Sequence, residues 1–325
     1  MVESSSNPHD ALFKRVFSVV ENAGSELRAV LPRAVVERID WSTLQPCPGS
    51  FVDEALVSCH SDLLYSVQLS GKAAFVYVLF EHQSSVDPVM PVRLLGYVAS
   101  VLGQHILQKA PPVLPLPMVV AVVLHHSETG WTKARSVEEL FDPELLRDPE
   151  VAGLLPRMGF VLDDISGLTD EELFQRALEL VPRVALWALR DARSPTRLLE
   201  SLPRVAPLLV ELLAAPDGLE AMTAIFRYIL WVSQLSVPEL TSAIRNAVPQ
   251  AEEAAMTTAE QLIAQGEAKG EARGRAELLL RLMTAKFGPL PEGLRLRVVA
   301  GSTAELEGWA DRFVTAASLG QVFQE

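Results

Sequence analysis

Two periodicities alternate along the first 135 residues, and together they predict an α/β domain. Apolar residues recur at helical spacing in Asp10–Leu31 and again in about 92–109, so both segments are expected to form amphipathic helices. Between them, segments 62–69 and 74–81 are rich in β-branched and aromatic residues, which predicts two strands. The continuous apolar segment 118–124 predicts a strand that is covered on both faces.

The short segment Ser70-Gly71-Lys72 joins the two central strands and has the turn chemistry of a β-hairpin. A hairpin brings Asp62, at the outer end of the first strand, beside Glu81 and Gln83, at the outer end of the second. Because side chains alternate along a strand, Glu81 and Gln83 share one face and His82 lies on the other. Two carboxylates that converge at one end of a sheet suit a hard divalent cation.

Beyond Trp131 the pattern becomes helical. Thr169-x-x-Glu172 and Ser136-x-x-Glu139 are candidate capping boxes, and Thr169 is expected to open a long helix whose apolar stripe reaches Trp187. Further helices are predicted at about 196–214, 217–234 and 237–248.

A single helical pattern then extends from Glu252 to Phe287, with glycine at positions 266, 270 and 274. Each interior glycine costs about 1 kcal/mol relative to alanine, so this helix is intrinsically weak. Two interpretations are open: the segment is a tether to the last domain, or its stripe of small residues pairs two chains into a homodimer.

Composition narrows the class of protein. The apolar content is 49% and the mean hydropathy +0.22, yet no uninterrupted apolar stretch approaches the roughly 20 residues that span a bilayer. The N-terminal residues lack the basic and apolar regions of a secretory signal. The two cysteines, Cys47 and Cys59, form no C-x-x-C motif or zinc-ligand cluster. We therefore expect no membrane association and a cytoplasmic location.

The net charge is −13, which argues against indiscriminate nucleic-acid binding, because phosphate affinity depends on clustered lysine and arginine. Some of the acids belong to the proposed cation site, where a bound ion would offset their charge. A phosphate loop or a dinucleotide fingerprint is not visible in the sequence.

Three blocks of sequence carry a resemblance to a known family: His9-Asp10-Ala11-Leu12-Phe13-Lys14, Pro48-Gly49-Ser50-Phe51-Val52-Asp53-Glu54 and Glu81-His82-Gln83-Ser84-Ser85. From about Asn7 to beyond Trp131 the chain resembles the Rpn family of recombination-promoting nucleases, also called YhgA-like transposases. Asp62 and Glu81-x-Gln83 look like the PD-(D/E)XK nuclease signature, with glutamine in place of the usual lysine. Leu278–Glu325 resembles the small helical domain that is often appended to these proteins.

The resemblance implies a restriction-endonuclease-like core that hydrolyses phosphodiester bonds of DNA. Asp62, Glu81 and Gln83 would be its catalytic residues, and Mg²⁺, or alternatively Mn²⁺, would be held by Asp62, Glu81 and the backbone carbonyl of His82. A link to recombination or mobile elements is also implied. The family usually shows a His-Gly pair after the buried strand, where this chain has His126-Ser127. This departure puts a glycine-dependent backbone turn in doubt.

Four other residues of the family blocks are candidates for accessory roles. Asp10 resembles an additional acid that some of these nucleases draw from the first helix, although an Asp there is commonly only a helix-dipole partner. Lys14 is a candidate phosphate contact or simply a solvated lysine. Asp53 and Glu54 directly precede the hairpin and are candidates for positions near the metal.

The resulting prediction is an α/β nuclease core at 1–135 followed by a mainly α-helical half. That half comprises a helical domain or extension of the core at 136–250, a glycine-punctuated linker at 251–277 and a small helical domain at 278–325. The predicted function is that of a Mg²⁺-dependent DNA endonuclease. The alternatives are a catalytically inactive nuclease-fold module that binds DNA or protein, and a regulatory self-assembling protein.

Overall fold

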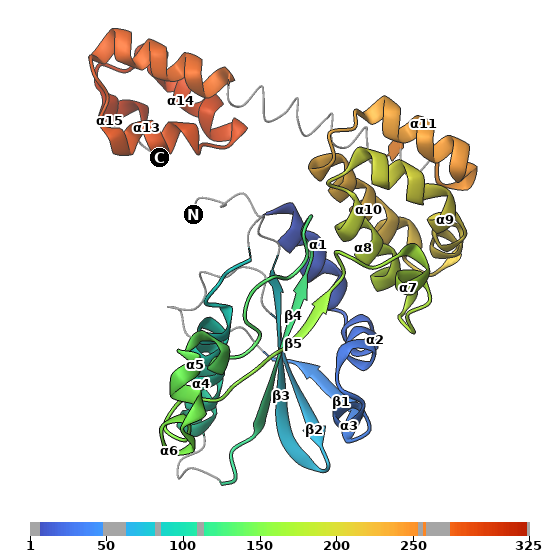
Figure 1. Ribbon diagram of the computed structural model, residues 1–325. Helices are drawn as coiled ribbons and strands as arrows, with labels where there is room; N and C mark the ends of the chain where they lie inside the picture. The colour runs from blue at the N-terminus through green and yellow to red at the C-terminus, as the bar shows by residue number, and fades with distance from the viewer. Residues whose placement is uncertain are drawn as a thin grey trace. The chain divides into compact units, whose positions relative to one another are not determined.

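The computed structural model describes residues 7–47, 63–81, 86–108, 114–252, 256–257 and 274–323, with the main chain alone for 77–81 and 303. The chain divides into two compact units, one spanning residues 5–255 and the other built around residues 256–325. Each unit has a hydrophobic core of its own. The first unit contains the sheet and the second is helical (Figure 1).

A five-stranded mixed sheet organises the first unit. Its strands lie in the order β1 (Ile39–Pro46), β2 (Leu63–Leu69), β3 (Lys72–Glu81), β4 (Met118–His125) and β5 (Val161–Asp164). The first three are antiparallel neighbours, whereas β3, β4 and β5 are parallel. The structure therefore confirms the predicted α/β class.

The predicted hairpin is confirmed, since β2 and β3 pair from Leu69 opposite Lys72 onward. Its two turn residues, Ser70 and Gly71, both have positive φ angles, of 52° and 75°. This is the left-handed geometry that matches the twist of the flanking strands. Gly71 adopts it at no steric cost.

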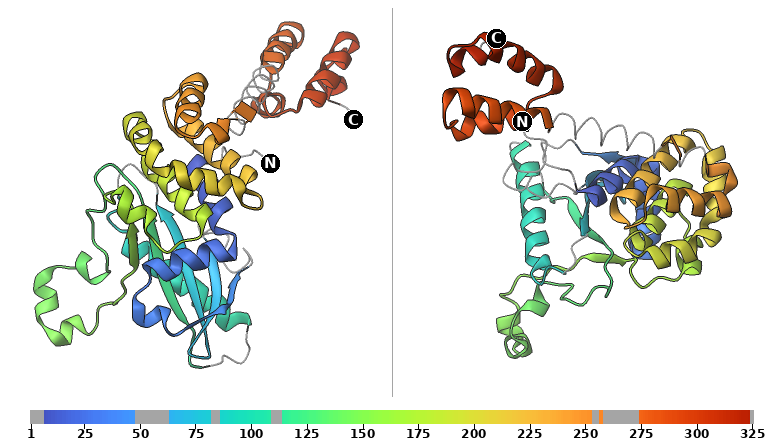
Figure 2. Two further views of the ribbon diagram at one scale, coloured as in Figure 1. Left: turned by 90° about the vertical axis from the view of Figure 1, so that its right-hand side faces the viewer. Right: turned by 90° about the horizontal axis from the view of Figure 1, so that it is seen from above.

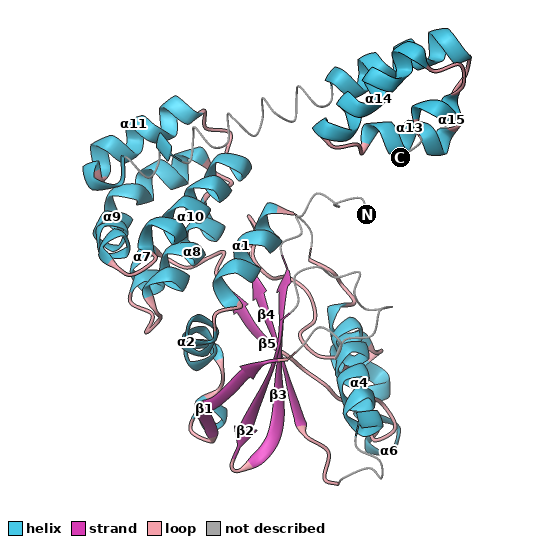
Figure 3. Ribbon diagram, turned by 180° about the vertical axis from the view of Figure 1, so that it is seen from behind, coloured by secondary structure: helices cyan, strands magenta, loops and turns pink. Residues whose placement is uncertain are grey.

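Helices cover the two faces of the sheet differently (Figure 3). On one face lie α1 (Pro8–Phe17) and α2 (Val20–Val30), followed by the short α3 (Arg33–Val36); on the other lies α4 (Met90–Gln108). Alternate residues of β2 serve the two faces, with Tyr65 in the core under α1 and Leu64 in the core under α4.

The expectation of one helix over Asp10–Leu31 was wrong, because the chain breaks into α1 and α2 at Ser18 and Val19. Val19 is extended, and Asn22 donates a side-chain hydrogen bond of 2.9 Å back to the carbonyl of Val16. The break lets α1 pack on helices far along the chain while α2 packs on β1. This tertiary packing overrides a local pattern that was continuous.

The remaining helices of this unit follow β4 and β5. They are the 3₁₀ turn η2 (Glu138–Leu140), α5 (Pro143–Arg147), α6 (Pro149–Ala152), α7 (Asp170–Phe174), α8 (Leu180–Asp191), α9 (Pro195–Ala214), α10 (Gly218–Val232), α11 (Val237–Ala247) and the 3₁₀ turn η3 (Pro249–Ala251). The predicted helices at 196–214, 217–234 and 237–248 are confirmed as α9, α10 and α11 within two residues.

Two expectations in this segment were wrong. The Thr169–Glu172 capping box is present, but α7 ends at Phe174 and a separate α8 carries Trp187. The intervening Arg176 turns away to pair with Asp163. Strand β5 lies in a segment that was expected to be helical, and its two aspartates are poor strand formers.

One hydrophobic core runs without interruption from α1 and the sheet to the helices of residues 180–251. Figure 2 shows the blue α1 beside the yellow helices that follow the sheet. The fully buried side chains of this core include Trp187, Val205, Ile229 and Ile244. Phe13 and Tyr65 are each only 1% exposed. The predicted boundary between residues 135 and 136 stays a prediction. The packing shows that α8–α11 share the core of the sheet's α1 face.

The second unit comprises a helical segment at 274–287, α13 (Glu292–Val299), α14 (Thr303–Thr315) and α15 (Leu319–Val322). Its core includes Met283, Val298 and Trp309, and Arg297 lies over the Trp309 ring at 5.6 Å. Gly266 and Gly270, which carry the prediction of a tether or a homodimer helix, lie outside the described residues. Across the described parts of the chain, helices long and apolar enough to cross a membrane are absent.

Candidate active site

The carboxyl ends of the parallel strands β3 and β4 lie side by side at one edge of the sheet. Glu81, the last residue of β3, pairs in register with His125, the last residue of β4. Leu63, which follows Asp62 in sequence, pairs with Val78, three residues before Glu81. The hairpin and the parallel pairing thus bring the start of β2 and the carboxyl ends of β3 and β4 to the same end of the sheet, which we call the edge of the site.

Most of the predicted metal and catalytic groups fall outside what the structure describes. Asp62, His82, Gln83, Asp53 and Glu54 lie outside the described residues, and Glu81 is described by its main chain only. Their roles stay predictions. Within the described residues, groups of three or more histidine, cysteine or acidic side chains that could hold a metal ion are absent.

The first turn of α1 lies against this edge. Asn7 caps the helix by accepting a 3.1 Å hydrogen bond from the backbone N–H of His9, and Pro8 occupies the first helical position. The ring of His9 lies 5.2 Å from the ring of His126, which directly follows β4. Asp10, in the same turn, is only 8% exposed, whereas Lys14 is half-buried one turn later.

Two residues far along the chain reach His9. Its Nδ1 lies 2.8 Å from the hydroxyl of Tyr228 on α10, and its Nε2 lies 3.2 Å from Nη2 of Arg193, which follows α8. Burial raises the pKa of the Tyr228 phenol, so this hydroxyl stays protonated. The sequence contained no signal for this cluster, because 219 positions separate His9 from Tyr228.

The end of β4 is held by contacts with the segment that follows β5. His125 is fully buried, and its Nε2 lies 3.0 Å from Oγ of Ser127. The backbone N–H of Ser127 donates to Oγ of Ser166 at 2.8 Å. Ser127 has no left-handed backbone, whereas Gly130 has φ of 71° and a Cβ there would lie 3.0 Å from Asp164 Oδ2. The left-handed glycine of this segment is therefore Gly130, and the residue after His126 does not adopt that conformation.

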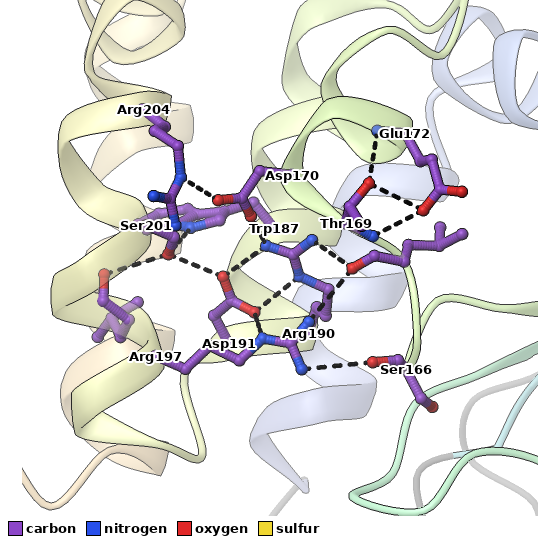
Figure 4. A network of polar contacts seen from close by, with 12 residues as sticks. Ser166, Thr169, Asp170, Glu172, Trp187, Arg190, Asp191, Arg197, Ser201 and Arg204 are labelled. Carbon is purple, nitrogen blue, oxygen red and sulfur yellow. Dashed lines mark hydrogen bonds and ion pairs between the residues drawn. The ribbon is translucent and has the colours of Figure 1, made fainter.

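A buried ionic network anchors the segment after β5 to the helices (Figure 4). On α8, Arg190 donates hydrogen bonds of 2.7 Å from Nε and from Nη2 to the carboxylate of Asp191. Arg190 also donates to Asp170 of α7. Arg197 donates from Nη1 to the carbonyl of Ser166 and, through Nε, lies 2.8 Å from Asp191. Contacts thus connect α8 and α9 through Ser166 to the end of β4.

Comparison with known proteins identifies the family of the chain. The family described as "Putative transposase, YhgA-like" matches residues 7–219, from α1 to the start of α10. The chain belongs to the YhgA-like family. Leu278–Glu325 lies beyond this match, so its resemblance to an appended helical domain stays a prediction.

Relatives of this YhgA-like protein include three from Escherichia coli. Recombination-promoting nuclease RpnD of strain O157:H7 is 32% identical over 80% of this chain and 95% of its own length. Inactive recombination-promoting nuclease-like protein RpnE of strain K12 is 30% identical, covering 82% and 85%, and recombination-promoting nuclease RpnA of K12 is 28% identical, covering 82% and 86%. No solved structure matches the chain significantly. The predicted Rpn-type resemblance is confirmed, and the relatives include both a named nuclease and a named inactive protein.

Proposed function

We propose that this YhgA-like protein is a metal-dependent endonuclease that hydrolyses phosphodiester bonds of DNA in the cytoplasm. The observation that carries the proposal is the position of Glu81. It ends the second strand of the hairpin, in register with the end of β4 and at the edge that receives the first turn of α1. Relatives named recombination-promoting nucleases support this reaction class and a role in recombination.

The chemistry of the edge fits a hard divalent cation. Asp10 contributes a nearly buried carboxyl in the turn that contacts the end of β4, and oxygen donors are the ligands that Mg²⁺ and Mn²⁺ accept. Asp62, Glu81 and the backbone carbonyl of His82 would hold the ion, with Asp10 as an accessory acid. Bound there, the ion would supply positive charge to the phosphoryl oxygens and lower the pKa of water.

The remaining residues of the proposed site are assigned to the orientation of water, to contacts with phosphate and to positions near the metal. The amide of Gln83 neither carries charge nor exchanges protons at neutral pH, so we assign it a positioning role toward water or a phosphate oxygen. Lys14 is proposed as a phosphate contact. Asp53 and Glu54 are proposed to lie near the metal, where each adds negative charge that the cation offsets.

A second candidate function is a catalytically inactive module that binds DNA or protein. Three observations favour it. The relative RpnE carries the word inactive in its name, Gln83 replaces the lysine of the nuclease signature, and the net charge of −13 weakens affinity for phosphates. This candidate predicts DNA or protein binding without cleavage.

Conversion of supercoiled plasmid with Mg²⁺ or Mn²⁺ separates the two candidates. We expect the wild-type protein to cut and Asp62→Ala or Glu81→Ala to abolish cutting, with thermal melts in the absence of metal unchanged. Glu37→Ala is the matched control, because Glu37 is an exposed acid paired with exposed Arg33. Wild-type protein that is folded and inert with both ions would support the inactive module.

The product of the same assay bears on assembly. We propose that a homodimer forms through the C-terminal helical region and places two sites in one particle, which favours cleavage of both strands. Sedimentation of the full chain should then give a dimer, and linear plasmid should appear early. A monomer that produces only nicked plasmid would contradict the homodimer, and the glycine-punctuated segment would then be interpreted as a tether.

A further inference from the structure

We propose that Arg193, in the turn after α8, and Tyr228, on α10, are positioning residues for the candidate active site. Arg193 sets the tautomer of His9 and Tyr228 binds the other ring nitrogen, and together they fix the first turn of α1, with Asp10, against the end of β4. The tautomer follows from the geometry alone, whereas the consequence for the site rests on the proposed function.

The hydrogen-bond roles at His9 are determined by its arginine partner. A guanidinium group carries only donors, so Nε2 of His9 must accept from Nη2 of Arg193 at 3.2 Å. The proton of the neutral ring is therefore on Nδ1, which donates to the hydroxyl oxygen of Tyr228 at 2.8 Å. A proton on Nε2 would point at the guanidinium and lose the interaction with Arg193, whereas the Tyr228 hydroxyl would reverse its role and donate to Nδ1.

The surroundings make this arrangement rigid. His9 is 8% and Tyr228 3% exposed, and their rings meet edge to face at 5.4 Å. The helix α1 packs on α8 and α10, and the two partners come from α10 and from the turn after α8. Because the cluster is shielded from water, a hydrogen bond lost here leaves a buried polar group without a partner, and water does not readily take the partner's place.

The position of His9 links this cluster to the site. Its ring packs on His126, the residue after His125, and His125 pairs with Glu81. Asp10 follows His9 in the same helical turn. A rotation of α1 that breaks the cluster would therefore move Asp10 relative to the strand ends, and displacements of about 1 Å can cost on the order of 100-fold in rate.

A second contact between the same two helices provides a control. Arg15 of α1 and Glu220 of α10 form an ion pair of 2.5 Å, with side chains 47% and 70% exposed. This pair also joins α1 to α10, but it lies two turns along α1 from His9 and is open to solvent. Glu220→Gln should therefore leave the tautomer and the site unchanged.

The first test reads the tautomer directly and does not depend on nuclease activity. The chain has six histidines, so spectra of ¹⁵N-histidine-labelled full-length protein are simple, and His9→Gln identifies the His9 signals. We expect wild-type His9 as the Nδ1–H tautomer. Arg193→Leu should release the Nε2–H form, whereas Glu220→Gln should not. A wild-type His9 protonated on Nε2 would overturn the proposal.

The second test concerns the site. Tyr228→Phe removes one hydroxyl and is expected to lower kcat for plasmid cleavage between about 10- and 100-fold, as loss of an outer partner of a metal site does, with KM within about threefold. His9→Asn keeps an N–H near the Nδ1 position and His9→Gln an acceptor near the Nε2 position. Each should retain more activity than His9→Leu, which keeps neither.

A third measurement replaces activity with metal binding. Broadening of histidine signals by Mn²⁺ should reach its midpoint at about 10-fold higher concentration in Tyr228→Phe than in Glu220→Gln. Equal midpoints and a wild-type kcat in Tyr228→Phe would overturn the positioning role. If wild-type protein neither cleaves DNA nor shows broadening, the proposed function fails, and the tautomer is still decided by the first spectra.

Discussion

Two arginines of the first unit, Arg190 and Arg176, pair with buried carboxyl groups, and they differ in how fully the charges around them are balanced. Arg190 is 1% exposed and meets Asp191, which is fully buried, as well as Asp170. Its Nη1 donates to the carbonyl of Leu168 at 2.9 Å. Ser201 donates 2.8 Å to Asp191 and accepts 2.8 Å from Trp187. Each charge in this network has several hydrogen-bond partners (Figure 4).

Glu26 and Asp163, by contrast, share Arg176, whereas Asp170 and Asp191 pair with Arg190 and additionally with Arg204 and Arg197. Arg176 makes a two-pronged contact with Asp163, 4% exposed, and a single 3.4 Å hydrogen bond to Oε1 of Glu26, 8% exposed. The other oxygen of Glu26 has no hydrogen-bond partner within the described residues. Burial, and then the negative charge of Asp163, raise the pKa of Glu26 well above 4.5 despite the opposing charge of Arg176.

The two sites therefore respond to pH in opposite directions. At Asp170 burial alone would raise the pKa, but hydrogen bonds from Arg190 and Arg204 lower it below 3.8. Its contribution to stability is present above pH 3.8 and is lost as the pH falls through its folded-state pKa. Glu26 contributes stability below pH 4.5 that is lost as the pH rises through its raised pKa. Burial of an ion pair is stabilising only where partners are sufficient.

The largest effect is expected from Asp191→Asn. The change leaves Arg190 buried with one carboxylate fewer, and breaking a buried pair in this way costs about 3–5 kcal/mol. Chemical denaturation at pH 7 measures the free energy of unfolding. A loss below about 1 kcal/mol would mean that Asp170 and the Leu168 carbonyl balance Arg190 alone, and the contrast with Arg176 would disappear.

An intermediate effect of opposite sign is expected from Glu26→Gln. The amide retains the shape of a protonated carboxyl and removes the need to take up or bury a charge, so the variant should be more stable at pH 7–8, by about 1 kcal/mol. The gain should shrink as the pH falls toward 4.5. Melting temperatures across this range test the prediction, with exposed Glu37→Gln as control. A gain in stability that does not vary with pH would contradict the prediction, because it would mean that Glu26 is not the group that takes up a proton on folding.

The smallest effect is expected from Arg204→Ala, at the exposed end of the balanced network. Arg204 is 60% exposed and contacts Asp170, which keeps Arg190 as its second partner. Exposed ion pairs are worth about 0–1 kcal/mol, so the unfolding free energy should change by less than that and depend on salt. A loss as large as that of Asp191→Asn would show that the whole network acts as one unit.

The sequence by itself determined those elements whose signal is local. Turn chemistry at Ser70-Gly71 predicted the hairpin, periodicity predicted α4 and α9–α11, and a continuous apolar segment predicted β4, because each reflects free energies within a few neighbouring residues. Together with the family blocks, these elements were enough to place Glu81 at the end of β3. The site residues Asp62 and Gln83 stay predictions on the same basis.

Only the tertiary structure decided the rest. The break at Val19 depends on what α1 and α2 pack against, and β5 tolerates Asp163 because Arg176 pairs with it. Arg176 meets Glu26 across 150 positions and His9 meets Tyr228 across 219. Such contacts leave no periodicity in the chain, because their energy comes from desolvation and hydrogen bonding that exist only once the core has closed.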